Sequence, residues 1–239
     1  MTRVITIARR ELGSYFASPM AYVVMAVFLL ACGFLFWDDF QPGQIAAMRN
    51  LFDWMVWMLV WTVPMLSMGL LAQEWSSGTM ETLMTVPLNE VDVVLGKFAG
   101  SFMFFLVLLS PTLLYVVLLA AFAIPGIDLG PILSGYLGIV LVGGLFTAVG
   151  LFCSSLTRSQ VVAAVSAAAV LFVVTIAPWW ASGKTLSSTW IAIINQTVFR
   201  RYTDFSRGVI DSGNLVFFVV TTAVFLFLSV KVLESRRWK

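Results

Sequence analysis

The sequence predicts an all-α membrane protein with six transmembrane helices. The first observation is composition, because 60% of the residues are hydrophobic and 11% are charged, against about 45–50% and about 25% in soluble proteins. The second is that charge-free apolar runs recur near the roughly 20 residues that a helix needs to cross a bilayer. The third is that these runs occupy most of the 239 residues. We therefore expect a single transmembrane domain, residues 1–239, and no soluble catalytic domain.

The first apolar run has a second interpretation, a cleaved signal peptide. That alternative is disfavoured because the run has the full length of a span, and Phe36 and Trp37 at its end do not make a small-residue cleavage site. We expect it to be retained as the first span. The six predicted spans are Pro19–Trp37, Trp54–Ala72, Phe98–Phe122, Leu133–Ser154, Gln160–Pro178 and Leu215–Val230.

Before the first span, residues 1–18 are predicted to form an interfacial helix. Six apolar residues fall largely on one helical face, and Arg3, Arg9 and Arg10 fall elsewhere. Such a helix lies along the inner leaflet, and the alternative is an ordinary positively charged flank. Pro19 then opens the span at a position that tolerates proline. The six apolar residues are Val4, Ile5, Ala8, Leu12, Tyr15 and Phe16.

The basic residues predict the orientation in the membrane. Six spans place both termini on one side, and that side holds nine of the 14 Lys and Arg residues. Cytoplasmic loops are enriched in these residues, so both termini are predicted to be cytoplasmic in a multi-pass protein of the bacterial inner membrane. The nine residues are Arg3, Arg9, Arg10, Lys97, Arg158, Lys231, Arg236, Arg237 and Lys239.

The polar segment between spans two and three, residues 73–97, is predicted to contain a short cytoplasmic helix. Gly78 can cap this helix with Glu81 at its third position, Leu83 lies on its apolar face, and Pro87 ends it. Two turns measure on the order of 12 Å, too short to cross a membrane. The alternative is a connecting turn with good caps.

The next helix is predicted to begin after Asn89. Glu90 and Asp92 would then lie in its first turn, where the helix dipole favours negative charge. Lys97 would extend its amine out of the membrane at the entry to the third span.

Missing residue types exclude several classes of function. The chain has no histidine, which excludes His-based metal sites, Ser–His catalysis and His proton relays. The span cores hold no Asp, Glu, Lys or Arg, which disfavours ion-coupled transport and an intramembrane enzyme. The P-loop motif G-x-x-x-x-G-K-[ST] is also missing. Energy for any work must therefore come from a partner.

Three sequence blocks resemble one family of membrane proteins. The segments ARRELGSYFASPMAY (8–22), FSRGVIDSGN (205–214) and LESRRW (233–238) resemble the gliding-motility (GldF-like) subgroup of type-2 ATP-binding-cassette (ABC) exporter permeases. The pattern E-x3-G-T-x-E-x-L-x-T-x-P followed by G-K resembles the coupling-helix region of these permeases. Its residues are Glu74, Gly78, Thr79, Glu81, Leu83, Thr85, Pro87, Gly96 and Lys97.

The resemblance implies a fold and roles for particular segments. The family has six helices per subunit, an N-terminal amphipathic elbow helix, a coupling helix in the first cytoplasmic loop and short re-entrant helices before the sixth span. Residues 179–214 would form the extracytoplasmic re-entrant region, because the apolar run Trp190–Phe199 is too short to cross. Four charged residues follow that run: Arg200, Arg201, Asp204 and Arg207.

Within the spans, tryptophans and prolines carry further predictions. Trp54, Trp57 and Trp61 fall within about 60° of helical arc, so they are candidates for an outer gate or a subunit seam, with ordinary lipid or core packing as the alternative. Pro64 and Pro111 are predicted to kink spans two and three.

In the fourth span the small residues Gly143, Gly144, Thr147 and Ala148 predict close contact with a neighbouring helix.

The resemblance implies the permease subunit of an ABC exporter, which catalyses nothing itself. Two separate ATPase subunits would bind ATP and magnesium, and a second permease chain would complete a homo- or heterodimer in membrane lipid. We expect no cofactor, metal or nucleic acid on this chain. The alternative is a mechanotransmission subunit that passes ATPase-driven motion to a periplasmic partner without moving a substrate.

Overall fold

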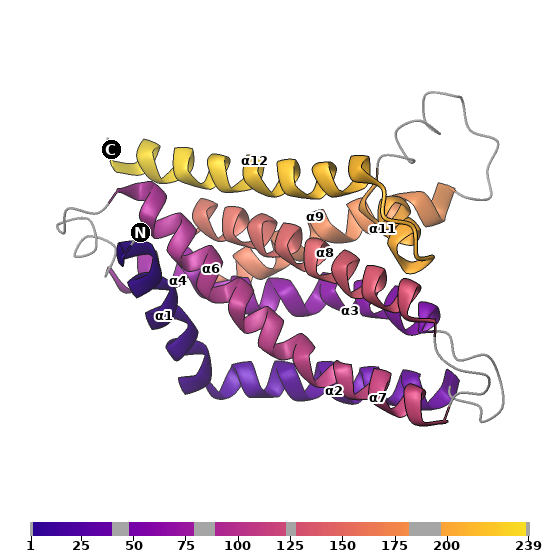
Figure 1. Ribbon diagram of the computed structural model, residues 1–239. Coiled ribbons are helices and arrows are strands. Elements are labelled where there is room, and N and C mark those ends of the chain that lie inside the picture. The colour runs from indigo at the N-terminus through magenta and orange to yellow at the C-terminus, as the bar shows by residue number, and fades with distance from the viewer. Residues whose placement is uncertain (1, 40–47, 79–88, 123–127, 182–196, 238–239) are drawn as a thin grey trace.

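A computed structural model describes residues 2–39, 48–78, 89–122, 128–181 and 197–237 (Figure 1). The described residues form helices joined by short connections, with no strand among them. The helices are α1 (Thr2–Ala17), α2 (Pro19–Asp39), α3 (Arg49–Ser67), α4 (Gly69–Ser77), α6 (Glu90–Leu109), η1 (Ser110–Thr112), α7 (Leu113–Phe122), α8 (Leu129–Leu156), α9 (Gln160–Ala181), α11 (Val198–Ser206) and α12 (Ser212–Arg237).

Five stretches of helix are long and apolar enough to cross a membrane. They are α2, α3 with α4, α6 through α7, α8 and α12. They match five of the predicted spans, and the chain is a multi-pass membrane protein. The remaining predicted span, Gln160–Pro178, corresponds to α9, of which the apolar part described with side chains is the shorter stretch Gln160–Thr175. The total of six spans therefore stays a prediction.

The two prolines for which kinks are predicted differ in their surroundings. In span two the interruption comes one turn after Pro64, at Met68, where α3 ends and α4 begins. In span three, Pro111 lies in the short 3-10 helix η1 between α6 and α7. Proline removes a backbone donor and crowds the turn before it, which accounts for the change of helix type at Pro111. Pro64 lies inside α3, so this effect does not account for the interruption at Met68, and a kink at Pro64 stays a prediction.

The central element of the bundle is α8, which contacts α3, α6, α9, α11 and α12. Its glycines are positions where neighbouring side chains fill the space of a missing Cβ. A Cβ on Gly138 would lie 2.8 Å from Phe205 Cβ, and one on Gly143 would collide with the Phe105 ring. The prediction of close helix contact along this span is therefore confirmed at Gly143.

The two ends of the bundle differ in their helices (Figure 1). We call the end where α1 begins and α12 finishes the proximal end, and the end that carries α11 the distal end. At the proximal end α1 packs mainly against α6. A small apolar cluster that includes Ile7, Leu71, Val94 and Leu233 joins α1, α4, α6 and α12 there.

The residues predicted to form an interfacial helix, 1–18, contain the helix α1. Ile7 and Ala8 are the buried residues of α1, whereas Ile5 and Phe16 are exposed. The sequence pattern places the apolar residues on one side of the helix, but the side that α1 buries is decided by its contact with α6. The location of α1 along a leaflet stays a prediction.

Candidate functional site

Four charged side chains from three helices meet at the proximal end. Lys97 Nζ on α6 lies 2.9 Å from Glu74 Oε1 on α4 and 3.2 Å from Glu11 Oε2 on α1. The same Glu74 oxygen lies 3.3 Å from Arg10 Nη2 on α1. We call Arg10, Glu11, Glu74 and Lys97 the proximal ion-pair cluster.

The position of Lys97 corrects the sequence-based prediction. Its side chain was expected to reach outward to water, but it is only 2% exposed. Removing an ammonium from water is costly unless oppositely charged partners replace the water. Glu11 and Glu74 supply two carboxylates, so the amine turns inward and joins α1 to α4.

Two glycines on α6 allow α1 to come close enough for this pairing. A Cβ on Gly96 would lie 2.7 Å from Ile7 Cβ, and a Cβ on Gly100 would lie 2.6 Å from Glu11 Cβ and 2.9 Å from the Ala8 carbonyl oxygen. No real Cβ fits at such distances. The signal that could have predicted this contact is the G-x-x-x-G spacing of Gly96 and Gly100, a pattern typical of close helix crossings.

The Tyr15 side chain connects α1 to the end of α3, close to the interruption of span two. Its hydroxyl donates to the Leu66 carbonyl oxygen at 2.6 Å and contacts Ser101 Oγ at 3.2 Å, and its ring stacks on Phe104 with centroids 4.7 Å apart. Burial raises the pKa of the Tyr15 hydroxyl above its usual value. The hydroxyl therefore stays protonated and can donate throughout the physiological pH range.

Ser154 on α8 supplies the hydrogen bonds that a continuous helix would have made between α3 and α4. Its Oγ accepts from the backbone N–H groups of Leu71 and Ala72, both at 3.0 Å, and donates to the Met68 carbonyl at 2.9 Å. Buried backbone groups need such partners. The interruption is thus stabilised by a side chain far away in sequence, and sequence analysis gave no sign of it.

The residues predicted to couple to an ATPase lie partly inside the described structure. Glu74 belongs to the proximal ion-pair cluster, on α4 rather than in a loop, because this helix continues to Ser77. Gly78 caps the C-terminal end of α4 with φ of 72°, a conformation that glycine adopts without strain. Thr79, Glu81, Leu83 and Pro87, and with them the predicted short helix, lie outside the described residues.

The helix that follows this segment, α6, begins where the sequence predicts, directly after Asn89. Asn89 has an extended backbone and occupies the N-cap position of α6, with Glu90 and Asp92 in the first turn. The Asn89 side chain makes no capping hydrogen bond.

Of the three arginines predicted for the N-terminal helix, Arg10 joins the cluster, while Arg3 and Arg9 are exposed.

At the distal end, two of the four predicted charged residues come together with α12. Arg201 Nη1 donates to Asn214 Oδ1 at 3.0 Å, and Asn214 Nδ2 donates to Asp204 Oδ2 at 2.9 Å. The Arg201 guanidinium also lies 4.3 Å from the centre of the Phe217 ring. Arg200 and Arg207 are exposed. The chain of contacts anchors α11 on the first turns of α12.

The three tryptophans of α3 differ in exposure. Trp54 and Trp61 are 48% and 54% exposed, with Trp61 lying 5.9 Å from Phe172 of α9 between ring centres. Trp57 is half-buried and packs on Phe199 of α11 at 6.2 Å. A role of these tryptophans in a gate or subunit seam therefore stays a prediction. Trp54 and Trp61 are the two whose side chains are accessible for such a contact.

Comparison with known proteins identifies the family. The family model described as ABC-2 family transporter protein matches residues 51–237, which is most of the chain. No curated protein matches the chain. The matched range contains Glu74, Lys97 and Ser154, whereas α1 precedes it. The chain belongs to the ABC-2 transporter family, whose members are membrane transport components rather than the ATPase, and it is a membrane permease of an ABC transporter.

Proposed function

We propose that the chain is the permease subunit of an ABC exporter. It pairs with a second permease chain and with two ATPase subunits, which bind ATP and magnesium. Its termini lie in the cytoplasm, and the bundle spans the inner membrane. The observation that supports this proposal best is the proximal ion-pair cluster, because it joins the helices on both sides of residues 79–88 to each other and to α1.

The cluster gives a path for force from an ATPase into the bundle. Glu74 precedes the segment 79–88 and Lys97 follows it, and their 2.9 Å ion pair ties α4 to α6 at the base of that segment. A push on the segment then moves α4, α6 and α1 together. Packed helices with a defined interruption move as rigid bodies between two states.

We place a change of direction of α4 relative to α3 at Met68, between the two helices. Its backbone groups bond to Ser154 of α8 in place of the regular helix. A change of angle at this point therefore does not have to break a continuous helical ladder, and we assign the hinge of the transport cycle to it.

The test is purification of the tagged chain from its native membrane, followed by native mass spectrometry. We expect two permease chains and two copies of a nucleotide-binding subunit in one complex. A complex that hydrolyses ATP with a single permease copy would refute the proposed assembly.

The mechanotransmission alternative predicts a further measurement. An exporter should move a substrate across proteoliposomes in an ATP-dependent manner. ATP hydrolysis that depends on an additional periplasmic-domain subunit, with no substrate movement, would favour mechanotransmission instead.

A further inference from the structure

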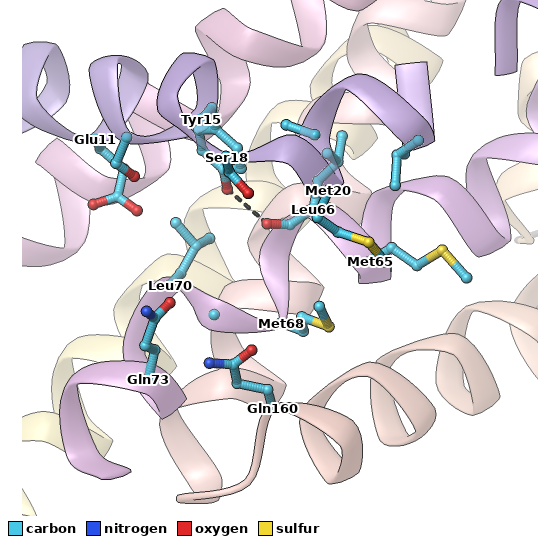
Figure 2. Close-up of a pocket in the computed structure, with 14 residues that line it drawn as sticks. Glu11, Tyr15, Ser18, Met20, Met65, Leu66, Met68, Leu70, Gln73 and Gln160 are labelled. Carbon is cyan, nitrogen blue, oxygen red and sulfur yellow. Dashed lines mark hydrogen bonds between the residues drawn. The ribbon is translucent and has the colours of Figure 1, made fainter. Parts of the chain in front are cut away.

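A pocket of about 370 Å³ lies at the proximal end between α1, α2, the junction of α3 and α4, and the start of α9. Pockets of about 300–1,000 Å³ are typical of small-molecule sites. In Figure 2 the amides of Gln73 and Gln160 lie at the lower left of the space, while Tyr15 and Ser18 lie on its upper side. The pocket is therefore lined from several helices that are far apart in sequence.

The lining of this pocket changes from polar to apolar along the bundle. Ser14, Ser18, Gln73, Gln160 and Glu11 supply hydroxyl, amide and carboxylate groups. The wall continues with Met20, Ala21, Val24 and Met65, which supply methyl, methylene and thioether groups. An occupant that satisfies both halves has a polar head and an apolar tail.

A second, apolar space, which we call the groove, lies next to the pocket. It has a volume of about 350 Å³ and runs between α3 and α9, lined by residues that include Trp61, Pro64, Met65, Ala168 and Phe172. Met65 lines both spaces, so its side chain lies between the pocket and the groove.

The length of the combined site matches one leaflet of a bilayer. Gln160 and Phe172 lie on the same helix, and the 12 residues between them rise about 18 Å. One leaflet contributes about half of the roughly 30 Å hydrocarbon core. An acyl chain anchored by its head near Gln160 thus reaches Phe172 within its own leaflet.

The charge of the pocket selects among lipid headgroups. Glu11 is the only charged residue of the lining, and no Lys or Arg lies among the described residues that line it. A primary ammonium carries three donors, for which the Glu11 carboxylate and the Gln73 and Gln160 amide oxygens are acceptors. A headgroup with a net negative charge meets no cation among the described lining residues, while Glu11 itself is paired through Oε2 with Lys97 at 3.2 Å.

We propose that this pocket and groove bind a lipid of the proximal leaflet whose headgroup carries a primary ammonium. The headgroup lies among Glu11, Gln73 and Gln160, and one acyl chain lies along the groove past Met65 toward Trp61 and Phe172. This binding does not depend on the export function, so it can hold or fail independently of it.

The test uses the full-length chain in nanodiscs that contain two photoactivatable phospholipids in equal amounts. Phosphatidylethanolamine carries the ammonium, phosphatidylglycerol does not, and both have the same diazirine-bearing acyl chain. After irradiation, mass spectrometry compares the adducts on the peptides that contain residues 61–65 and 164–172. We expect ethanolamine adducts to exceed glycerol adducts on the order of tenfold, the effect of one charge-assisted hydrogen bond.

Two variants with matched controls separate this site from general boundary lipid. Gln160→Lys introduces a cation into the pocket and should abolish or reverse the preference, whereas Ser159→Lys, on an exposed neighbour outside the lining, should preserve it. Ala168→Trp fills the groove and should reduce adducts of both lipids there, whereas Val170→Trp, exposed on the same helix outside the groove, should not.

Three results would overturn the proposal. Equal labelling by the two lipids in the wild-type chain would indicate ordinary boundary lipid. A preference unchanged in Gln160→Lys would remove the pocket from the explanation. Cross-links between two copies of the chain at residues 164–172, in place of lipid adducts, would mean that a second copy covers the groove.

Discussion

Replacing Lys97 with methionine tests whether the proximal ion-pair cluster holds the proximal helices together. Methionine keeps the length and volume of the side chain but removes the ammonium. Glu74 and Glu11, which are 15% and 13% exposed, then lose the cation that lies 2.9 and 3.2 Å away. Removing one partner of a buried ion pair costs about 3–5 kcal/mol, because the remaining charge is left uncompensated.

The assay is thermal unfolding of the purified chain in detergent. For a chain of this size, 1 kcal/mol shifts Tm by about 2–4 °C, so Lys97→Met should lower Tm on the order of 10 °C. The triple variant Lys97→Met with Glu11→Gln and Glu74→Gln removes all three charges and should recover most of the loss, because isosteric neutral groups replace a buried ion pair at little cost.

The matched control is Lys231→Met. Lys231 pairs with Glu234 at 2.6 Å, but both side chains are exposed, and such pairs contribute at most about 1 kcal/mol. If Lys97→Met were no less stable than Lys231→Met, the cluster would not join α1, α4 and α6 as argued.

Three further predictions concern the helix contacts and the topology. Gly100→Ala places a Cβ 2.6 Å from Glu11 Cβ and should lower the free energy of unfolding by about 1–3 kcal/mol, whereas Gly13→Ala, with no atom within 4 Å of the new Cβ, should not lower it. Ser154→Ala leaves backbone groups at the Met68 interruption unpaired and should cost about 1–3 kcal/mol in the same assay. Ser155→Ala, whose hydroxyl bonds only within its own helix at 2.6 Å, should cost less, and equal losses would contradict the role of Ser154. A cysteine at Ser77 should react with an impermeant thiol reagent only from the cytoplasm, and labelling from outside would reverse the proposed orientation.

The helices were predictable from sequence because a membrane leaves the chain few choices. Backbone groups in hydrocarbon must bond within the segment, so a long charge-free run becomes a helix. The described bounds agree closely at Pro19, where a proline opens the run. The end of span two was predicted too early, because the helix continues past the polar residues Gln73 and Glu74 to Gly78.

The cluster was not predictable in the same way. Lys97 and Glu11 are 86 residues apart, and nothing local shows that their helices meet. Gly96 and Gly100 have a spacing typical of helix crossings, but such a spacing does not identify the partner helix. Gly78 illustrates the related ambiguity of local signals, since glycine is favourable at both ends of a helix, and its described role is the C-terminal cap of α4.

The central claim is that the segment that begins at Gly78 transmits work between the ATPase and the bundle, and Gly78 allows a direct test. With φ of 72° and no atom within 4 Å of its missing Cβ, Gly78 can be replaced by asparagine, which tolerates this backbone conformation, or by valine, which does not. Forcing valine into it costs about 1–3 kcal/mol, so the chain should leave α4 in a different direction without loss of the spans.

The deciding experiment purifies complexes that contain the Gly78→Val, Gly78→Asn or Glu81→Lys chain. Two quantities are measured for each complex: the rate of ATP hydrolysis and the amount of bound ATPase. We predict normal membrane abundance for all three, wild-type attachment and coupling for Gly78→Asn, and weakened attachment or uncoupled hydrolysis for Gly78→Val and Glu81→Lys. Wild-type attachment and coupling in both Gly78→Val and Glu81→Lys would contradict the account, because the segment would then be a connection and not the contact with the ATPase.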